Sequence, residues 1–122
     1  MPLVRVEFIS KRYLKEKDRI SSIIHNALTT FLNSNINDLR IRYNRLKKGN
    51  FVLLGRSNDY LFIEILLMKG RTKNQKKELF KNIAVKLKDE FSVLDNDLTI
   101  FINEQPKENW GIRGGLQASE FL

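Results

Sequence analysis

Apolar positions recur along the chain with two spacings, which predict its helices and strands. Steps of three and four residues predict a helix over about 13–33 and a second helix that begins after Thr72, each with one apolar stripe. The two stripes consist of Ile20, Ile23, Ile24, Ala27, Leu28, Phe31 and Leu32, and of Leu79, Phe80, Ile83, Ala84 and Leu87. Thr72 and Gln75 predict a capping box at the start of the second helix. Strands are predicted before and after each helix, at about 3–9, 38–44, 60–68 and 97–104.

The two halves of the chain are related by an internal repeat. A shift of 59 residues lays 4–12 over 63–71 and 38–41 over 97–100 without a gap. Each half therefore reads as one β-α-β unit, at about 2–51 and 61–110, joined by an irregular linker at about 45–59. We expect one domain that spans residues 1–122.

The length of the predicted helices fixes the expected topology. A helix of about 20 residues is long enough for a right-handed crossover, so the two strands of each unit should be parallel. Because each helix has one apolar stripe, both should pack on the same face of a four-stranded sheet, in an α+β fold. The other face would then be left for a partner chain to cover.

Composition excludes several kinds of chemistry. The 122 residues contain no Cys and one His, which excludes disulfides, Cys-based zinc sites and His-rich metal clusters. We expect no metal and no cofactor. The longest apolar run, 65–68, is far shorter than the ~20 residues that cross a bilayer. Since the amino terminus also lacks a signal-peptide pattern, we expect a cytoplasmic protein without a membrane partner.

The basic net charge raises the question of whether the protein binds nucleic acid. With 22 Lys and Arg against 14 Asp and Glu, the net charge is +8, and clustered basic residues would favour nucleic acid. Here acidic residues lie between the basic ones, as in 76–78 and 86–90, which is typical of a solvated helix face. We therefore expect no nucleic-acid partner. Glycines at 111, 114 and 115 favour a turn or small hairpin near the carboxyl end.

The amino terminus carries the first candidate for chemistry. Removal of Met1 would leave Pro2 as a free secondary amine at the start of a buried strand. Burial and nearby arginines would lower the proton affinity of such an amine. Pro2 would then be a base at neutral pH.

Several motifs, in order and in duplicate, resemble the tautomerase superfamily, whose small members resemble 4-oxalocrotonate tautomerase. In the first half these are Pro2 at the start of a strand, Arg12 at the turn and the segment 38–41. In the second half, 69–77 is similar to the Gly-Arg-Ser turn and helix start of that family, and 102–115 is similar to its closing segment. The resemblance implies the tautomerase/MIF-like fold.

The resemblance also implies roles for individual residues. Pro2 would be the catalytic amine, and Arg12 and Arg71 would bind or polarise a substrate carboxylate. Arg40 would support a second carboxyl or carbonyl group, and Trp110 would keep the pocket dry. The implied substrate is a small anionic keto or enol acid, since arginines fork onto carboxylates.

Departures from the family pattern leave the reaction open. Leu61 stands where the second unit would carry its own proline, and Thr99 replaces its strand arginine. Asp38, with Lys69 and Arg71 at the second turn, is more similar to the malonate semialdehyde decarboxylase branch, in which the aspartate assists Pro2. Asp38 would otherwise only cap a turn, because Asp97 occupies the equivalent place in the unit without a proline.

We therefore expect an isomerase that uses Pro2 as general base in a keto–enol tautomerisation. The alternatives are a decarboxylase or hydratase with protonated Pro2 and Asp38, and a non-enzymatic binding protein of the same fold. Relatives with two units per chain form trimers, so the resemblance implies a homotrimer.

Overall fold

The computed structural model describes residues 2–122, so the predicted removal of Met1 lies outside the described residues. The secondary structure elements, in chain order, are β1 (Leu3–Phe8), α1 (Lys11–Lys15), α2 (Lys17–Leu32), β2 (Arg40–Arg45), β3 (Leu61–Met68), α3 (Lys73–Phe91), β4 (Leu98–Gln105), β5 (Gly111–Ile112) and β6 (Leu116–Gln117). Short 3-10 turns lie at Asp95–Asp97, Lys107–Asn109 and Ala118–Glu120.

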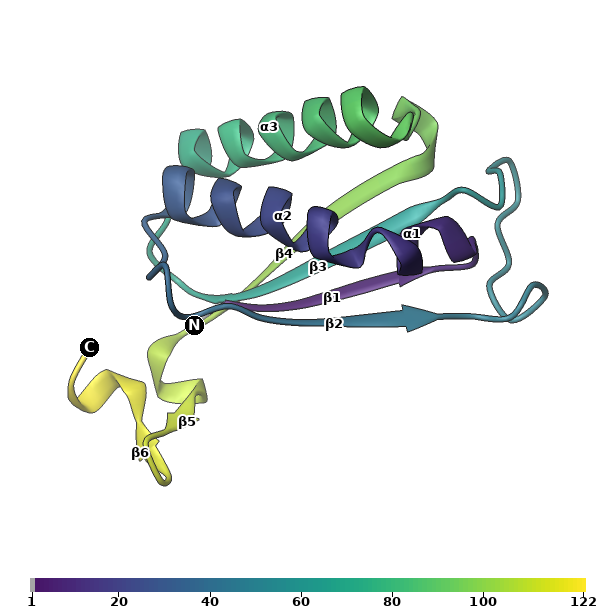
Figure 1. Ribbon diagram of the computed structural model, residues 1–122. Helices are drawn as coiled ribbons and strands as arrows, with labels where there is room; N and C mark the ends of the chain where they lie inside the picture. The colour runs from purple at the N-terminus through teal and green to yellow at the C-terminus, as the bar shows by residue number, and fades with distance from the viewer. Residues whose placement is uncertain (1) are drawn as a thin grey trace.

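The main sheet has four strands in the order β2-β1-β3-β4 (Figure 1). β1 is parallel to β2, and β3 is parallel to β4, as expected for two β-α-β units. The two units meet where β1 and β3 pair antiparallel, with Leu3 opposite Leu66 and Phe8 opposite Leu61. The start of each central strand therefore lies beside the end of the other.

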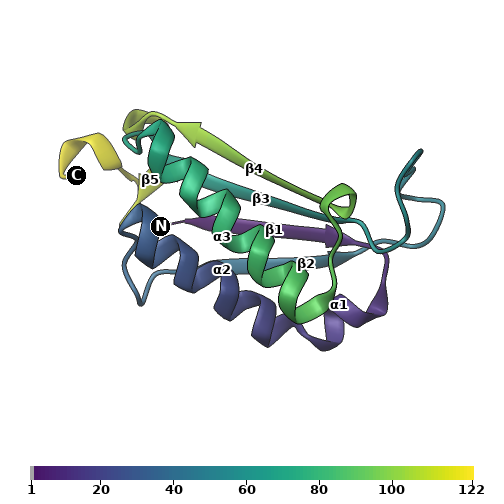
Figure 2. The same cartoon turned by 90° about the horizontal axis from the view of Figure 1, so that it is seen from above.

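Both long helices cover the same face of the sheet, which confirms the predicted α+β fold (Figure 2). Alternate residues of the central strands point toward them and are fully buried, because successive side chains of a strand point to opposite faces. These strand residues are Val4, Val6, Phe8, Leu61, Ile63, Ile65 and Leu67. Burying each large apolar side chain stabilises the fold by about 1.5–3 kcal/mol.

The first helix differs from the single helix predicted over 13–33. It begins at Lys11, with the Ser10 hydroxyl accepting from the Arg12 amide, and it is interrupted at Glu16, whose φ of −104° and ψ of 17° are not helical. The apolar spacing did not reveal this break because it begins only at Ile20. The predicted capping box of Thr72 and Gln75 is confirmed at the start of α3.

The face opposite the helices carries both apolar and charged side chains. Phe62 and Leu66 of β3 are partly buried on this face, and Phe101 of β4 is 49% exposed. Between them lies an ion pair in which Arg5 donates to the buried carboxylate of Glu64. No helix among residues 2–122 covers this face (Figure 1).

The carboxyl-terminal segment 106–122 projects from the end of the sheet (Figure 1). It contains the predicted small hairpin, formed by β5 and β6. The segment folds back on itself, since Ala118 is buried and its amide donates to the Trp110 carbonyl at 2.9 Å. This segment therefore forms one wall at the end of the sheet where β1 begins.

Candidate functional site

Strand pairing determines which predicted site residues lie near Pro2. Pro2 is buried and directly precedes β1, whose first residue Leu3 pairs with Arg40 of β2 and with Leu66 of β3. The segment before β2 and the turn after β3 therefore meet at the Pro2 end of the sheet. This end is where the antiparallel pairing of β1 and β3 brings residues of the two units together.

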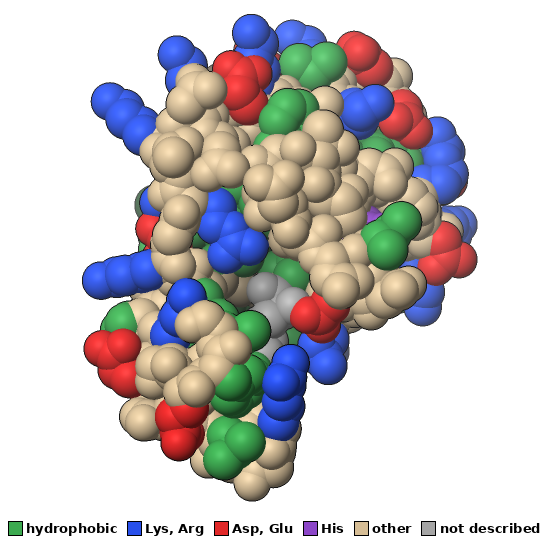
Figure 3. All heavy atoms as spheres, turned by 90° about the vertical axis from the view of Figure 1, so that its left-hand side faces the viewer, with side chains coloured by type: hydrophobic (Ala, Val, Ile, Leu, Met, Phe, Trp, Pro, Cys, Tyr) green, Lys and Arg blue, Asp and Glu red, His purple; other side chains and the backbone are tan. Residues whose placement is uncertain are grey.

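A cavity of about 680 Å³ lies at this end of the molecule. Its lining residues are Asn35, Asp38, Arg40, Met68, Arg71, Ile112, Arg113 and Leu122. They come from the segment before β2, from the end of β3 and the turn after it, and from the carboxyl-terminal segment. Figure 3 shows that the surface is hollowed where this last segment meets the rest of the molecule, with basic side chains beside the hollow.

Asp38 and Arg40 form an ion pair at the cavity. Arg40 Nη1 lies 2.7 Å from Asp38 Oδ1, and the two side chains are 63% and 34% exposed. A pair this accessible to water adds about 0–1 kcal/mol to stability. The Arg40 guanidinium is therefore open to solvent at the cavity.

Arg71 is held at the cavity by two main-chain carbonyl groups. Its Nε and Nη2 both donate to the Leu32 carbonyl at 3.3 Å, and its Nη1 donates to the Met68 carbonyl at 3.3 Å. The Leu32 carbonyl belongs to the last turn of α2, where carbonyls lack partners within the helix. These bonds fix the guanidinium and leave further N–H groups for a ligand.

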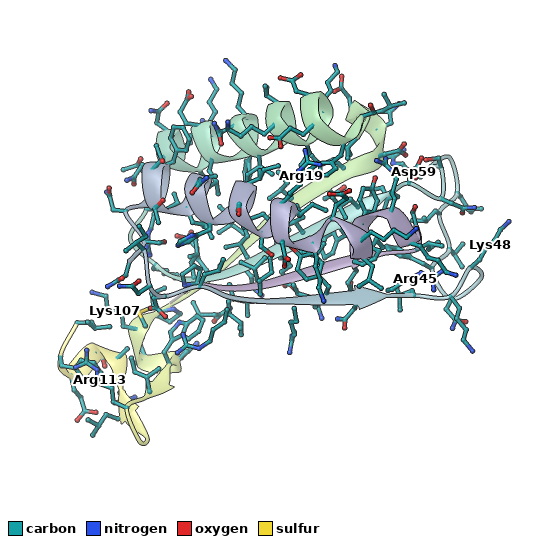
Figure 4. The ribbon with its side chains drawn as sticks, in the orientation of Figure 1. Arg19, Arg45, Lys48, Asp59, Lys107 and Arg113 are labelled. Atoms are coloured by element: carbon teal, nitrogen blue, oxygen red, sulfur yellow. The ribbon has the colours of Figure 1, made fainter. Side chains whose placement is uncertain are left out.

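Arg12 lies at the opposite end of the sheet within the same chain. It follows the end of β1, and its Nε donates to Asp59 Oδ1 at 3.1 Å. It also donates to the Phe91 carbonyl and, at 3.0 Å, to the Tyr13 hydroxyl. One chain therefore does not bring Arg12 together with Pro2. Figure 4 shows Asp59, the ion-pair partner of Arg12, and the cavity residue Arg113 at opposite ends of the molecule.

Two further predicted residues lie near the cavity without being part of its lining. The Lys69 side chain is exposed, and its amide donates to the Gln105 carbonyl at 3.0 Å. Trp110 is partly buried, and its indole Nε1 donates to the same carbonyl at 3.4 Å. The apolar lining from the carboxyl-terminal segment comes from Ile112 instead.

Sequence reasoning missed Arg113 as a cavity residue. It stands between Ile112 and Gly114, where the glycines predict a turn or small hairpin and no binding role is predicted. Position 113 lies outside both repeat units, so the internal comparison gave no signal for it. The one feature of the sequence that could have indicated a role for this residue is a charged side chain in the glycine-rich segment 111–115.

A second hollow, of about 710 Å³, runs along α3. Its lining residues are Lys73, Lys76, Lys77, Phe80, Lys81 and Ala84. All of them belong to one helix surface, and one of its lysines, Lys76, is already paired with Glu104 of β4. The cavity at the Pro2 end combines groups from several elements, so we place the candidate site there.

Residues 2–122 contain no group of acidic, His or Cys side chains that could hold a metal ion. None of the helices described is long and apolar enough to cross a membrane.

Comparison with known proteins gives consistent matches. A family model described as "Tautomerase enzyme" matches residues 39–113, which is more than half of the chain. The probable tautomerase YusQ of Bacillus subtilis (strain 168) is 25% identical over 121 residues, covering 94% of this chain and 95% of the relative. The 2-hydroxymuconate tautomerase of Pseudomonas putida is 36% identical over 53 residues, covering 43% of this chain and 84% of that enzyme.

Solved structures share the fold over nearly the whole chain. Native fused 4-OT superimposes with a TM-score of 0.84 at 20% identity, covering 98% of both chains. A fused 4-OT asymmetric trimer gives a TM-score of 0.83 at 21% identity, covering 97% of both chains. Malonate semialdehyde decarboxylase gives a TM-score of 0.81 at 18% identity, covering 97% of this chain and 96% of that one.

Proposed function

The chain belongs to the tautomerase enzyme family, and from this premise we propose that it is an isomerase that uses Pro2 as its general base. The substrate class is a small anionic 2-keto or enol acid. The observation that carries this proposal is the cavity at the Pro2 end, whose lining holds several guanidinium groups. The family match begins at residue 39, so the role of Pro2 rests on its buried place at this end.

The proposed reaction moves one proton between oxygen and carbon. The neutral amine of Pro2 takes the proton from the enol hydroxyl, and the electron pair moves onto the substrate as an enolate. The protonated amine then returns the proton to carbon, which gives the ketone and restores neutral Pro2. Burial of Pro2 and the neighbouring guanidiniums favour the neutral amine, as general-base catalysis requires.

Arg71 and Arg40 have separate parts in this proposal. Arg71 is fixed by carbonyl bonds, so it can bind a substrate carboxylate without first being ordered. Arg40 is more exposed and is paired with Asp38, so it would turn to the substrate as negative charge develops on the enolate. Lys69 and Trp110 would close the pocket from its edge, the lysine adding positive charge and the indole excluding water.

Asp38 supports a second candidate function. Its carboxylate lines the cavity and is held by Arg40. If Pro2 is protonated, Asp38 would polarise or activate water beside it, giving decarboxylase or hydratase chemistry on a β-keto acid. The similarity to malonate semialdehyde decarboxylase adds weight to this alternative.

We further propose that the active form is a homotrimer. The sheet face without helices carries Phe62, Leu66 and Phe101, and the segment 106–122 projects from the molecule. Both features suit contact with other copies of this chain, and related fused chains are described as trimers. Light scattering at micromolar concentration should give about three times 14.4 kDa. A stable and active monomer would contradict this assembly.

The test of function compares two substrates with untagged protein. We expect ketonisation of phenylenolpyruvate, measured by the loss of enol absorbance, and less or no decarboxylation of malonate semialdehyde. The opposite order would favour the decarboxylase, and neither activity would favour a binding protein. Intact-mass measurement of the same sample should show that Met1 has been removed, because an amide at Pro2 is not a base. Active protein that retains Met1 throughout would exclude Pro2 as the base.

A further inference from the structure

Arg113 is the cavity cation with no carboxylate or carbonyl partner among residues 2–122. Arg40 is paired with Asp38, and Arg71 donates to the carbonyls of Leu32 and Met68. No hydrogen bond or ion pair within the described chain engages the guanidinium of Arg113, although this residue lines the same cavity. Its donors are therefore available to a ligand.

Its position is nevertheless well defined by its surroundings. The guanidinium carbon lies 4.2 Å from the centroid of the Phe121 ring, a cation–π contact within the carboxyl-terminal segment. The backbone of Arg113 is left-handed, with a φ of +51°, in the turn between β5 and β6. Stacking on a ring covers the flat face of a guanidinium and leaves its N–H edge open, which is the edge that binds carboxylates.

The charge of the cavity favours a ligand with two negative groups. Its lining side chains include the three guanidiniums of Arg40, Arg71 and Arg113 and one carboxylate, that of Asp38. The lining therefore has a net side-chain charge of +2. A ligand with one carboxylate leaves one of these side-chain charges without compensation, whereas a dicarboxylate balances both.

We propose that Arg113 is a specificity-determining residue that binds the distal carboxylate of a two-acid substrate, while Arg71 binds the carboxylate next to the enol that reacts at Pro2. This role rests on the proposed function, since it assumes that the substrate reacts in this cavity. It assigns recognition to the carboxyl-terminal segment, which lies outside both repeat units. Specificity would then be controlled separately from the proton transfer.

Binding of two unreactive probes tests this role without any turnover. trans,trans-Muconate and sorbate share a six-carbon diene and differ in one carboxylate, so their affinities isolate the second charge. Charge-assisted bonds contribute about 1.5–3 kcal/mol, or roughly 10- to 100-fold. By calorimetry at fixed ionic strength, wild type should bind muconate at least about 10-fold more tightly than sorbate, and Arg113→Ala should remove most of this preference.

Two control variants separate recognition from general charge and from folding. Arg113→Lys should restore part of the preference, because a lysine keeps the charge but loses the fork and the ring contact. Arg56→Ala removes an equal charge from the exposed linker at the other end, where Arg56 donates to the Gly55 carbonyl, and it should leave both affinities unchanged. Equal losses for both probes in Arg113→Ala, no loss at all, or the same loss in Arg56→Ala would each overturn the proposal.

Kinetics then separate this proposal from the proposed function. Arg113→Ala should raise KM for 2-hydroxymuconate by about 10-fold and leave KM for phenylenolpyruvate within about twofold, with kcat little changed for both. Wild type that converts neither compound would overturn the proposed function, while the probe affinities would still decide the role of Arg113. Pro2→Ala should retain the muconate preference, because it changes the amine proposed as the base and leaves the guanidinium groups in place.

Discussion

The two ends of the sheet are built from equivalent residues of the internal repeat, but one end has a cavity and the other is filled by packed side chains. Four pairs of residues, 59 positions apart, occupy equivalent places at the two ends. They are Pro2 and Leu61, Asp38 and Asp97, Arg40 and Thr99, and Arg71 and Arg12. The first member of each pair lies at the end with the cavity, and the second member lies at an end where side chains and the linker pack together.

The feature that the two ends share is structural. Arg71 donates to the carbonyl of Leu32, and Arg12 donates to the carbonyl of Phe91, which is its equivalent in the repeat. Each arginine therefore binds the last turn of the helix in the other unit. This symmetry indicates that the turn arginine first serves to join the two units, and that any role in substrate binding is added to this one.

The features that differ follow from the linker. At the Leu61 end, Asp97 is buried and accepts from the Ser57 hydroxyl at 2.8 Å and from its amide at 3.3 Å. Asp59 of the linker also accepts from Arg12, and the hydroxyl of Tyr60, directly after the linker, donates to the Thr99 hydroxyl. A linker that joins the units makes the nitrogen of residue 61 an amide, so this end cannot supply a basic amine. If Pro2 is the base, as proposed, the joined chain has one end for chemistry, and its other end has only a structural role.

Substitution at the first pair should have the largest effect. Pro2→Ala should lower kcat/KM by at least about 10²-fold, because it changes the amine proposed as general base. Leu61→Ala should keep the activity of the folded enzyme and lower the free energy of unfolding by about 2–5 kcal/mol, since Leu61 is fully buried. Steady-state kinetics and urea unfolding measure the two effects. A fully active Pro2→Ala enzyme would show that the ends do not differ in this way.

Substitution at the arginine pair should separate the shared role from the added one. Arg71→Ala and Arg12→Ala each remove charged hydrogen bonds to a helix end, so each should lower the free energy of unfolding by about 1.5–3 kcal/mol. Only Arg71→Ala should also lower kcat/KM, by about 10- to 100-fold. Equal kinetic losses would show that Arg12 takes part in a site, which in a trimer would require another copy of the chain.

The sequence predicted the local elements of the fold but not which of the site residues lie together. The repeat predicted both units, their parallel strands and the capping box of Thr72, because these depend on local spacing and on short crossovers. The repeat also predicted the same substrate-binding role for Arg12 and Arg71, because the two residues occupy equivalent positions in it. Only the antiparallel pairing of β1 and β3 separates them, and that pairing depends on contacts between the units. Arg113 was missed because no repeat position corresponds to it.

Substitutions of Asp97 and Asp38 should have smaller effects, with the larger loss of stability at Asp97 and the larger loss of activity at Asp38. Asp97→Asn should lower the free energy of unfolding by about 1–3 kcal/mol, because one of its two buried acceptor bonds from Ser57 would be lost. Asp38→Asn should change stability by less than about 1 kcal/mol, because its ion pair with Arg40 is exposed. The kinetic effect should have the reverse order, with Asp38→Asn the more damaging. If both variants are fully active, Asp38 only caps the segment before β2.

The smallest expected effect near neutral pH belongs to Tyr13, which lies at the end with Leu61, here called the closed end, and which also predicts a loss of stability in alkali. Burial raises the pKa of Tyr13 to about 12 from an ordinary value of 10, and its hydroxyl donates to the Asp59 carbonyl of the linker. The equivalent position at the end with the cavity is Thr72, an exposed helix cap that does not titrate in this range.

Because the pKa of Tyr13 is higher in the folded state, the folded protein keeps this phenol protonated while the unfolded chain ionises. Its contribution is complete below pH 10 and is lost as the pH rises from about 10 to 12, by up to about 2–3 kcal/mol. Tyr43, whose pKa burial also raises to about 12, should contribute a similar loss. Tyr13→Phe should therefore be less stable than wild type at pH 8 by about 1 kcal/mol, from the lost hydrogen bond, yet lose less stability between pH 9 and pH 11.5. Urea unfolding at these pH values measures the slope, and an unchanged slope in Tyr13→Phe would mean that this phenol does not hold the closed end together.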